Sequence, residues 1–208
     1  MSSEEVKTPL RDWFLMGCIV EGGLGGVALA LGWFFDFSPF ENLSWNFTDL
    51  LLGIFVTTPM LGLFWLTLHS KSGPLSEIRL FSENYLRPLF ESWSVWKLAV
   101  LSILAGIGEE LLFRGFIQGI LDGTTDTFLA VAFSGLLFGC FHMVTPVYAI
   151  VTACIGWYLG WLWIWSGNLL VPIVAHAAYD FIALVYFLKF HPPMPMTDMD
   201  TESHADDF

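Results

Sequence analysis

The stretch that decides the fold runs from Val95 to Leu121 and reads VWKLAVLSILAGIGEELLFRGFIQGIL. It is long and apolar enough to cross the roughly 30 Å hydrocarbon core of a bilayer as a helix. Its second half nevertheless carries Glu109, Glu110 and Arg114. Ionised side chains are costly in hydrocarbon, so a chain that keeps them there generally uses them. This stretch therefore predicts both a membrane protein and the position of a functional site.

The composition of the whole chain agrees with a membrane protein. Of its 208 residues, 55% are hydrophobic, 17% aromatic and only 13% charged. A soluble domain of this size has too little interior to bury so much apolar surface. We expect an all-α, polytopic transmembrane bundle with about six spans. The predicted spans are 13–35, 50–68, 95–121, 128–142 with a start near Thr125, 148–165 and 169–188.

Three regions follow from this assignment. Residues 1–94 would contain an N-terminal tail, two spans and a long cytoplasmic connection between spans two and three, in which 80–90 suggests an amphipathic surface helix. Residues 95–190 would form a four-span core. Residues 191–208 are acidic and are predicted to be disordered.

The basic residues predict the orientation in the membrane. The start of the chain is polar and is followed by a long apolar run without a small-residue cleavage site, so we expect a first span rather than a cleaved signal peptide. Apart from Arg114, the basic residues fall in the N-terminal tail, in the connection after span two or at the C-terminal end; they are Lys7, Arg11, Lys71, Arg79, Arg87, Lys97 and Lys189. The positive-inside rule then places both termini in the cytoplasm. We expect a multi-pass protein of a bacterial plasma membrane, with the lipid bilayer as one partner and no nucleic acid, since no basic cluster is present.

Spacing within the third span separates its two acids. On an α-helix Glu110 and Arg114 share a face at i and i+4, whereas Glu109 points about 100° away. We therefore expect Glu110 to pair with Arg114 and Glu109 to be free. A carboxylate without a cationic partner in a low dielectric is a candidate general base for activating water. A structural ion pair between helices is the alternative for any single pair of such residues.

Two later spans carry the remaining candidates. His142 ends the fourth span, where a histidine could equally be an interfacial residue. His176 and Asp180 are i and i+4 in the sixth span, so Asp180 could accept from one ring nitrogen and set the tautomer, or the two could simply pack helices. Pro172 could bend this helix and open a polar cavity beside His176.

Together these residues form three ordered motifs on three spans. The motifs are Glu109-Glu110-x-x-x-Arg114, Phe138-x-x-x-His142 and His176-x-x-x-Asp180, the last preceded by a Gly167-Asn-Leu-x-x-Pro segment. In this respect the sequence resembles the CPBP intramembrane proteases, which include the type II CAAX prenyl endopeptidases and bacterial proteins linked to bacteriocin processing or immunity. The resemblance covers residues 96–188.

The resemblance implies hydrolysis of a peptide bond in a membrane-associated or lipidated peptide or protein substrate. It implies that Glu109 and His142 hold and deprotonate the attacking water, while His176 and Asp180 face the oxyanion. Arg114 would hold Glu110. The prenyl endopeptidases have Asn at the position of Asp180, and an ionised Asp cannot donate to an oxyanion. We expect Asp180 to orient His176 and to leave the donation to that ring.

The sequence leaves metal dependence open. Glu109, His142 and His176 could bind a divalent metal such as zinc with an open position for water, or could act as acid and base without one. The His-Glu-x-x-His pattern of many zinc proteases is absent. In either case hydrolysis needs a water-filled cavity that opens to the cytoplasm.

Two functions of other classes remain alternatives. One is a non-catalytic membrane protein, of the bacteriocin-immunity or scaffold type, that keeps the polar cluster for packing or for binding a partner. The other is an ion- or proton-coupled transporter, because buried Glu, His and Asp also form proton relays. The sequence shows no inverted repeat and no matched pair of broken helices, which argues against transport.

Overall fold

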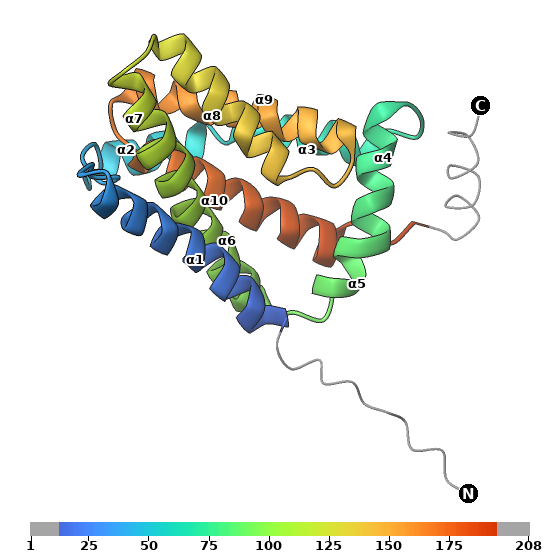
Figure 1. Ribbon diagram of the computed structural model, residues 1–208. Helices are drawn as coiled ribbons and strands as arrows, with labels where there is room; N and C mark the ends of the chain where they lie inside the picture. The colour runs from blue at the N-terminus through green and yellow to red at the C-terminus, as the bar shows by residue number, and fades with distance from the viewer. Residues whose placement is uncertain (1–12, 195–208) are drawn as a thin grey trace, which may run out of the picture.

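The computed structural model describes residues 13–194, and the regular structure in this range is helical throughout (Figure 1). The predicted acidic tail from Pro195 onward, together with Lys7 and Arg11, lies outside the described residues. The elements are α1 (Trp13–Phe34), α2 (Phe47–Phe55), α3 (Thr58–His69), α4 (Pro74–Phe81), η1 (Ser82–Leu86), α5 (Arg87–Phe90), α6 (Val95–Glu110), η2 (Leu111–Gln118), α7 (Gly119–Asp122), α8 (Thr127–Phe141), α9 (Pro146–Ser166), α10 (Leu170–Val185) and η3 (Tyr186–Phe190), where η denotes π-helical turns.

Four helices of the described part are long and apolar enough to cross a membrane. They are α1, α2 with α3, α9, and α10 with η3. Helix α8 is apolar but shorter, at 15 residues. The run α6–η2–α7 has the length of a span but contains Glu109, Glu110 and Arg114. The predicted helical membrane fold is confirmed at this level, and the number of six spans stays a prediction.

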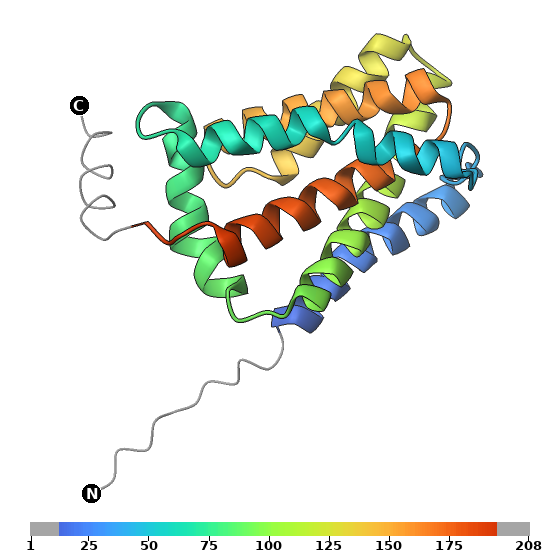
Figure 2. The same cartoon turned by 180° about the vertical axis from the view of Figure 1, so that it is seen from behind.

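Helix α10 lies at the centre of the bundle. Both views place α6 and α1 on one side of it and α3 and α9 on the other (Figures 1 and 2). Helix α10 contacts α6, α2 and α9, while α1 packs on α6 and α8 packs on α9. Residues on α6, α8 and α10 are thereby brought together although they are far apart in the chain.

The second predicted span is two helices rather than one. Pro59 lies in the first turn of α3 and has no backbone N–H to continue the hydrogen-bonding of α2. The hydroxyl of Thr58 donates instead to the carbonyl of Phe55 at 2.8 Å, and that of Thr57 donates to the carbonyl of Gly53 at 2.9 Å. The break is therefore satisfied by side chains, as buried backbone groups require.

The third predicted span is one helical run that changes its pitch directly after Glu110. The amide of Gly119 donates to the carbonyl of Arg114, five residues back, as in a π-helix. π-Helical turns are rare in proteins, and those that occur are often found at functional sites. The predicted pair of Glu110 and Arg114 is formed although the helix departs from ideal α geometry after Glu110.

Pro172 does not have the predicted effect. Helix α10 begins at Leu170, so Pro172 lies in its first turn, where backbone N–H groups have no partner within the helix. It removes no helical hydrogen bond, so there is no reason for Pro172 to bend the helix beside His176. The turn before α10 is held by Asn168, which accepts from the amides of Ser44 and Leu170 and donates to the side chain of Asp49.

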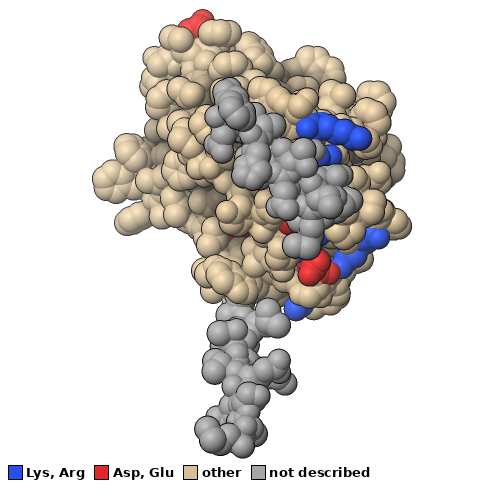
Figure 3. All heavy atoms as spheres, turned by 90° about the vertical axis from the view of Figure 1, so that its right-hand side faces the viewer, with Lys and Arg blue, Asp and Glu red and all other residues tan. Residues whose placement is uncertain are grey.

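The connection between the second and third predicted spans forms a continuous helical segment, α4–η1–α5. It begins at Pro74 rather than near Leu80, and it packs against α3, α9 and η3. Figure 3 shows Lys and Arg side chains gathered on the face of the molecule at this end of the bundle. Within residues 13–194, the basic residues of the predicted cytoplasmic side therefore gather at this end of the bundle.

Candidate functional site

All six predicted site residues lie around one point in the bundle. Glu109 and Glu110 end α6, Arg114 lies in η2, His142 follows the last residue of α8, and His176 and Asp180 lie on α10, with Asp180 one turn after His176. Glu110 and Arg114 are fully buried, and Glu109 and His176 are each 6% exposed. His142 and Asp180 are partly exposed. The fold thus gathers the ionisable groups that the sequence distributes over three segments.

The predicted pair of Arg114 and Glu110 is present. Arg114 Nη1 donates to Glu110 Oε1 at 2.7 Å, and Arg114 Nη2 donates to the carbonyl of Gly156 on α9 at 2.9 Å. The guanidinium also lies over the ring of Phe138, 4.4 Å from its centroid. Because a buried charge is tolerated only when it is paired and hydrogen-bonded, this arrangement accounts for the position of Arg114.

Glu110 has a second partner that the sequence did not indicate. The Nδ1 atom of His176 lies 2.8 Å from the same Oε1 atom that accepts from Arg114. A carboxylate oxygen that accepts from a guanidinium is also the acceptor for a ring N–H, so His176 donates from Nδ1. Asp180 Oδ2 lies 3.5 Å from the other nitrogen, Nε2. The expectation that Asp180 orients His176 is wrong, because Glu110 makes the closer contact and holds the ring.

His142 is oriented by its own helix. Its Nδ1 lies 2.8 Å from the carbonyl oxygen of Phe138, which can only accept, so this nitrogen carries the proton. The other nitrogen, Nε2, faces Glu109 Oε2 at 3.7 Å, and His176 Nε2 faces the same oxygen at 3.9 Å. These distances are too long for direct hydrogen bonds.

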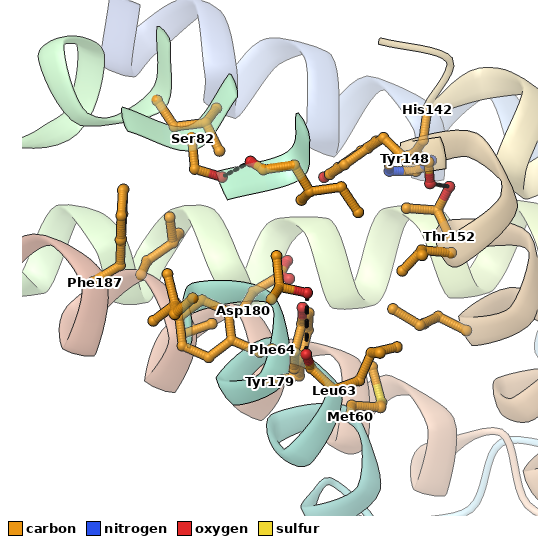
Figure 4. Close-up of a pocket in the computed structure, with 18 of the residues that line it drawn as sticks. Met60, Leu63, Phe64, Ser82, His142, Tyr148, Thr152, Tyr179, Asp180 and Phe187 are labelled. Carbon is orange, nitrogen blue, oxygen red and sulfur yellow. Dashed lines mark hydrogen bonds between the residues drawn. The ribbon is translucent and has the colours of Figure 1, made fainter. Parts of the chain in front are cut away.

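A cavity of about 160 Å³ adjoins this cluster (Figure 4). His142, His176 and Asp180 line it together with Tyr148, and its remaining wall is mainly apolar and comes from α3, α4, η1, α9 and α10. Since a water molecule occupies about 30 Å³ of the liquid, the cavity has room for several waters or for one large side chain. It extends from the histidines toward the α4–η1 segment.

Sequence reasoning missed two polar residues at the site. Tyr148, in the first turn of α9, lines the cavity beside His142; nothing in its sequence context distinguishes it from the other aromatic residues. Glu21 on α1 lies within side-chain hydrogen-bonding reach of Glu109. It could have been found, because it is an ionisable residue within an apolar span, which is the property that singled out Glu109.

Glu109, His142 and His176 are residue types that bind metal ions, but their arrangement does not fit a metal site. Each histidine donates its Nδ1 proton to an oxygen acceptor and turns Nε2 toward Glu109, which is typical of histidine ligands. Ligand atoms around a tetrahedral zinc ion lie about 3.3 Å apart, closer than the 3.7 and 3.9 Å found here. Among residues 13–194, no three His, Cys, Asp or Glu side chains are placed to hold a metal ion.

Comparison with known proteins identifies the family that the core resembles. Residues 91–182 match the family model described as type II CAAX prenyl endopeptidase Rce1-like. The resemblance drawn from the motifs is confirmed. All three motifs lie inside the matched range, whereas α1, α2 and α3 lie outside it. The ionisable groups that meet at the site are therefore in the part of the chain that is similar to this family.

A search of curated proteins finds a relative in Bacillus subtilis (strain 168), described as uncharacterized protein YpbD. It is 29% identical over 97 residues, which are 45% of this chain and 47% of that protein. The match thus spans about half the length of this curated relative. No solved structure matches the chain.

Proposed function

We propose that the protein is an intramembrane endopeptidase of the CAAX-protease type, which hydrolyses a peptide bond in a membrane-associated or lipidated substrate. The observation that carries the proposal is the position of Glu109 Oε2, which is buried, accepts no hydrogen bond from the N–H groups of the described residues and faces the Nε2 atoms of His142 and His176. Three separate helices converge to make this arrangement, and a cavity adjoins it.

Glu109 and His142 have the geometry needed to activate water. A water molecule between them donates one hydrogen bond to Glu109 Oε2 and one to His142 Nε2. As its oxygen attacks the carbonyl carbon of the substrate, one of its protons passes to Glu109. The carbonyl π electrons become the lone pair of an oxyanion. When this intermediate collapses, the C–N bond breaks and the proton returns from Glu109 to the leaving nitrogen, which restores the base.

His176 faces the side on which the oxyanion forms. Its Nε2 atom can donate to the oxyanion when it carries a proton, while Nδ1 remains bonded to Glu110. The chain of contacts from Arg114 through Glu110 to His176 fixes the ring before the substrate arrives. Asp180, 3.5 Å from Nε2, lies on the cavity wall.

The cavity supports an apolar substrate segment. The walls supplied by α3, η1 and α10 include Met60, Phe64, Leu86 and Leu184. A side chain or lipid portion that occupies this space would hold the neighbouring peptide bond next to the histidines, and such positioning contributes to the rate by fixing the reacting groups. The sequence-level proposal of six spans with both termini in the cytoplasm of a bacterial cell would place the α4–η1 end of the cavity on the cytoplasmic side.

Cleavage of peptides by the purified protein in detergent or liposomes tests this function. Wild type is assayed beside Glu109→Gln and His142→Ala against membrane-anchored peptides with apolar residues next to the cleavage site. We expect both variants to lose at least about a hundredfold in kcat, because a general base contributes about 10² to 10⁴ in rate. Leu136→Ala, an exposed change on α8, is the matched control and is expected to keep wild-type activity.

The same assay separates the alternatives. Cleavage that survives Glu109→Gln would exclude Glu109 as the base. A chelator arm tests the zinc prediction, since inhibition that is reversed by added zinc would assign a metal-dependent step to Glu109, His142 and His176. A folded wild type that cleaves no membrane peptide would favour the non-catalytic scaffold or immunity function.

A further inference from the structure

Glu21 is the one acidic or basic residue of α1, which is otherwise apolar from Trp13 to Phe34. Its carboxyl group is partly buried, and its Oε2 atom accepts no hydrogen bond from the donors of the described residues. A helix that served only to pack against α6 would have no use for such a group, because placing a carboxylate among apolar helices is costly. The position of Glu21 therefore calls for a partner at the site.

A close backbone contact between α1 and α6 brings Glu21 to the site. The carbonyl oxygen of Glu21 and the backbone of Gly25 occupy the space that a side chain at position 108 would need. Gly108 therefore allows α1 to lie directly on α6, next to Glu109 and one turn before the π-helical segment begins. The close approach of the two backbones determines which residue of α1 faces Glu109.

The carboxyl groups of Glu21 and Glu109 then lie within hydrogen-bonding reach of each other. In each of the two glutamates Oε2 is buried and lacks an N–H or hydroxyl donor among the described residues. Two carboxyl oxygens can satisfy each other only through a shared hydrogen, in which one group donates O–H and the other accepts.

We propose that Glu21 is a positioning residue for Glu109. A hydrogen shared between the two carboxyl groups keeps Glu109 Oε2 turned toward His142 and the attacking water. The inference rests on the proposed function for its catalytic consequence, and it extends the site to α1, which lies outside the range matched by the family model. The N-terminal helix would thus be a part of the active site and not only a membrane anchor.

Three variants of the full chain test the proposal by their kinetics. Glu21→Leu removes the hydrogen-bonding group, Glu21→Gln keeps a polar group of the same shape at the same place, and Val20→Leu puts the same apolar residue at an exposed neighbouring position on α1. We expect Glu21→Leu to lower kcat by about tenfold or more with KM within about twofold, since small misplacements of catalytic groups cost up to about a hundredfold. Glu21→Gln should recover most of that loss, and Val20→Leu should behave as wild type. A folded Glu21→Leu variant with wild-type kcat, or a Glu21→Gln variant as slow as Glu21→Leu, would overturn the proposal.

A readout that needs no activity separates this inference from the proposed function. Midpoints of thermal unfolding are measured for wild type, Glu21→Leu, Glu109→Leu and the double variant. Residues in contact give non-additive losses, whereas independent sites add. We expect the double variant to lose clearly less than the sum of the two single variants. If wild type cleaves no peptide, the proposed function fails while this cycle still decides the contact, and additive losses would then refute it.

Discussion

Arg114 is fully buried and makes polar contacts in two directions. It donates to Glu110 on its own helical run and to the carbonyl of Gly156 on α9. Glu110 in turn holds His176. A single guanidinium therefore connects the packing of α9 with the orientation of a ring on α10. Lysine is not an equivalent replacement, because Arg114 reaches its two acceptors from two separate nitrogens of a planar guanidinium, whereas lysine has a single nitrogen.

Replacing Arg114 tests this role at the level of single residues. Arg114→Met leaves Glu110 buried without its cation, and breaking a buried pair in this way costs about 3–5 kcal/mol of stability. We expect the midpoint of thermal unfolding in detergent to fall accordingly. The double variant Glu110→Gln with Arg114→Met removes the unpaired charge as well and should be more stable than Arg114→Met alone. If the double variant is the less stable of the two, the charge of Glu110 is not what Arg114 compensates.

At the level of helices, η2 and α9 are joined in register by two residues on each. Arg114 donates to the carbonyl of Gly156, and Gln118 donates to the carbonyl of Gly160 at 3.2 Å. Arg114 and Gln118 are four residues apart on one helix, and Gly156 and Gly160 are four residues apart on the other. A side chain at Gly156 would meet the backbone of Gly135 on α8, and one at Gly160 would meet the amide group of Gln118. The glycines thus allow α8, α9 and η2 to approach closely enough for these bonds.

Alanine substitution distinguishes this glycine pair from the equally spaced pair Gly22 and Gly26 on α1. A Cβ atom at Gly156 would lie 3.0 Å from Gly135 Cα, so Gly156→Ala must move α8. We expect a loss of about 1–3 kcal/mol in stability, as for other overpacked interiors. Gly26→Ala is the matched control, since no atom lies within 4 Å of a Cβ at that position; it should leave stability unchanged or slightly increase it. Both are measured by thermal unfolding, and equal losses would contradict the assignment of the tight interface.

At the level of the whole molecule, the arrangement of basic residues supports one orientation. Lys71, Arg79, Arg87, Lys97 and Lys189 lie in or beside α4, α5, the start of α6 and η3. The loops at the opposite end contain acidic residues instead, such as Glu41, Asp122 and Asp126. The cavity extends from the histidines toward the basic end, so orientation and access of the substrate are connected.

Cysteine labelling in intact bacterial cells tests the orientation. The three native cysteines, Cys18, Cys140 and Cys154, are first replaced by Ala, and single cysteines are introduced at the exposed positions Ser72 and Thr124. With both termini in the cytoplasm, we expect a membrane-impermeant maleimide to label Thr124→Cys in intact cells and Ser72→Cys only after permeabilisation. The reverse pattern would show that the cavity opens to the outside.

Local patterns in the sequence determined much of this protein. Apolar runs predict the helices, because a bilayer requires every backbone hydrogen bond to be made within the segment. The i and i+4 spacing predicts the pair of Glu110 and Arg114, since both lie on one helical turn. The three motifs indicate the family and the residues at its centre.

Only the tertiary structure decided which groups from different helices meet. Glu110 holds His176 although 66 residues separate them, and Asp180, closer in sequence, does not. Glu21 reaches Glu109 because Gly108 allows two backbones to touch, and no periodicity within α1 reveals that contact. Helix formation depends on neighbours along the chain, whereas the partners of a buried charge depend on how the helices pack, and a single sequence contains the first kind of information far more directly than the second.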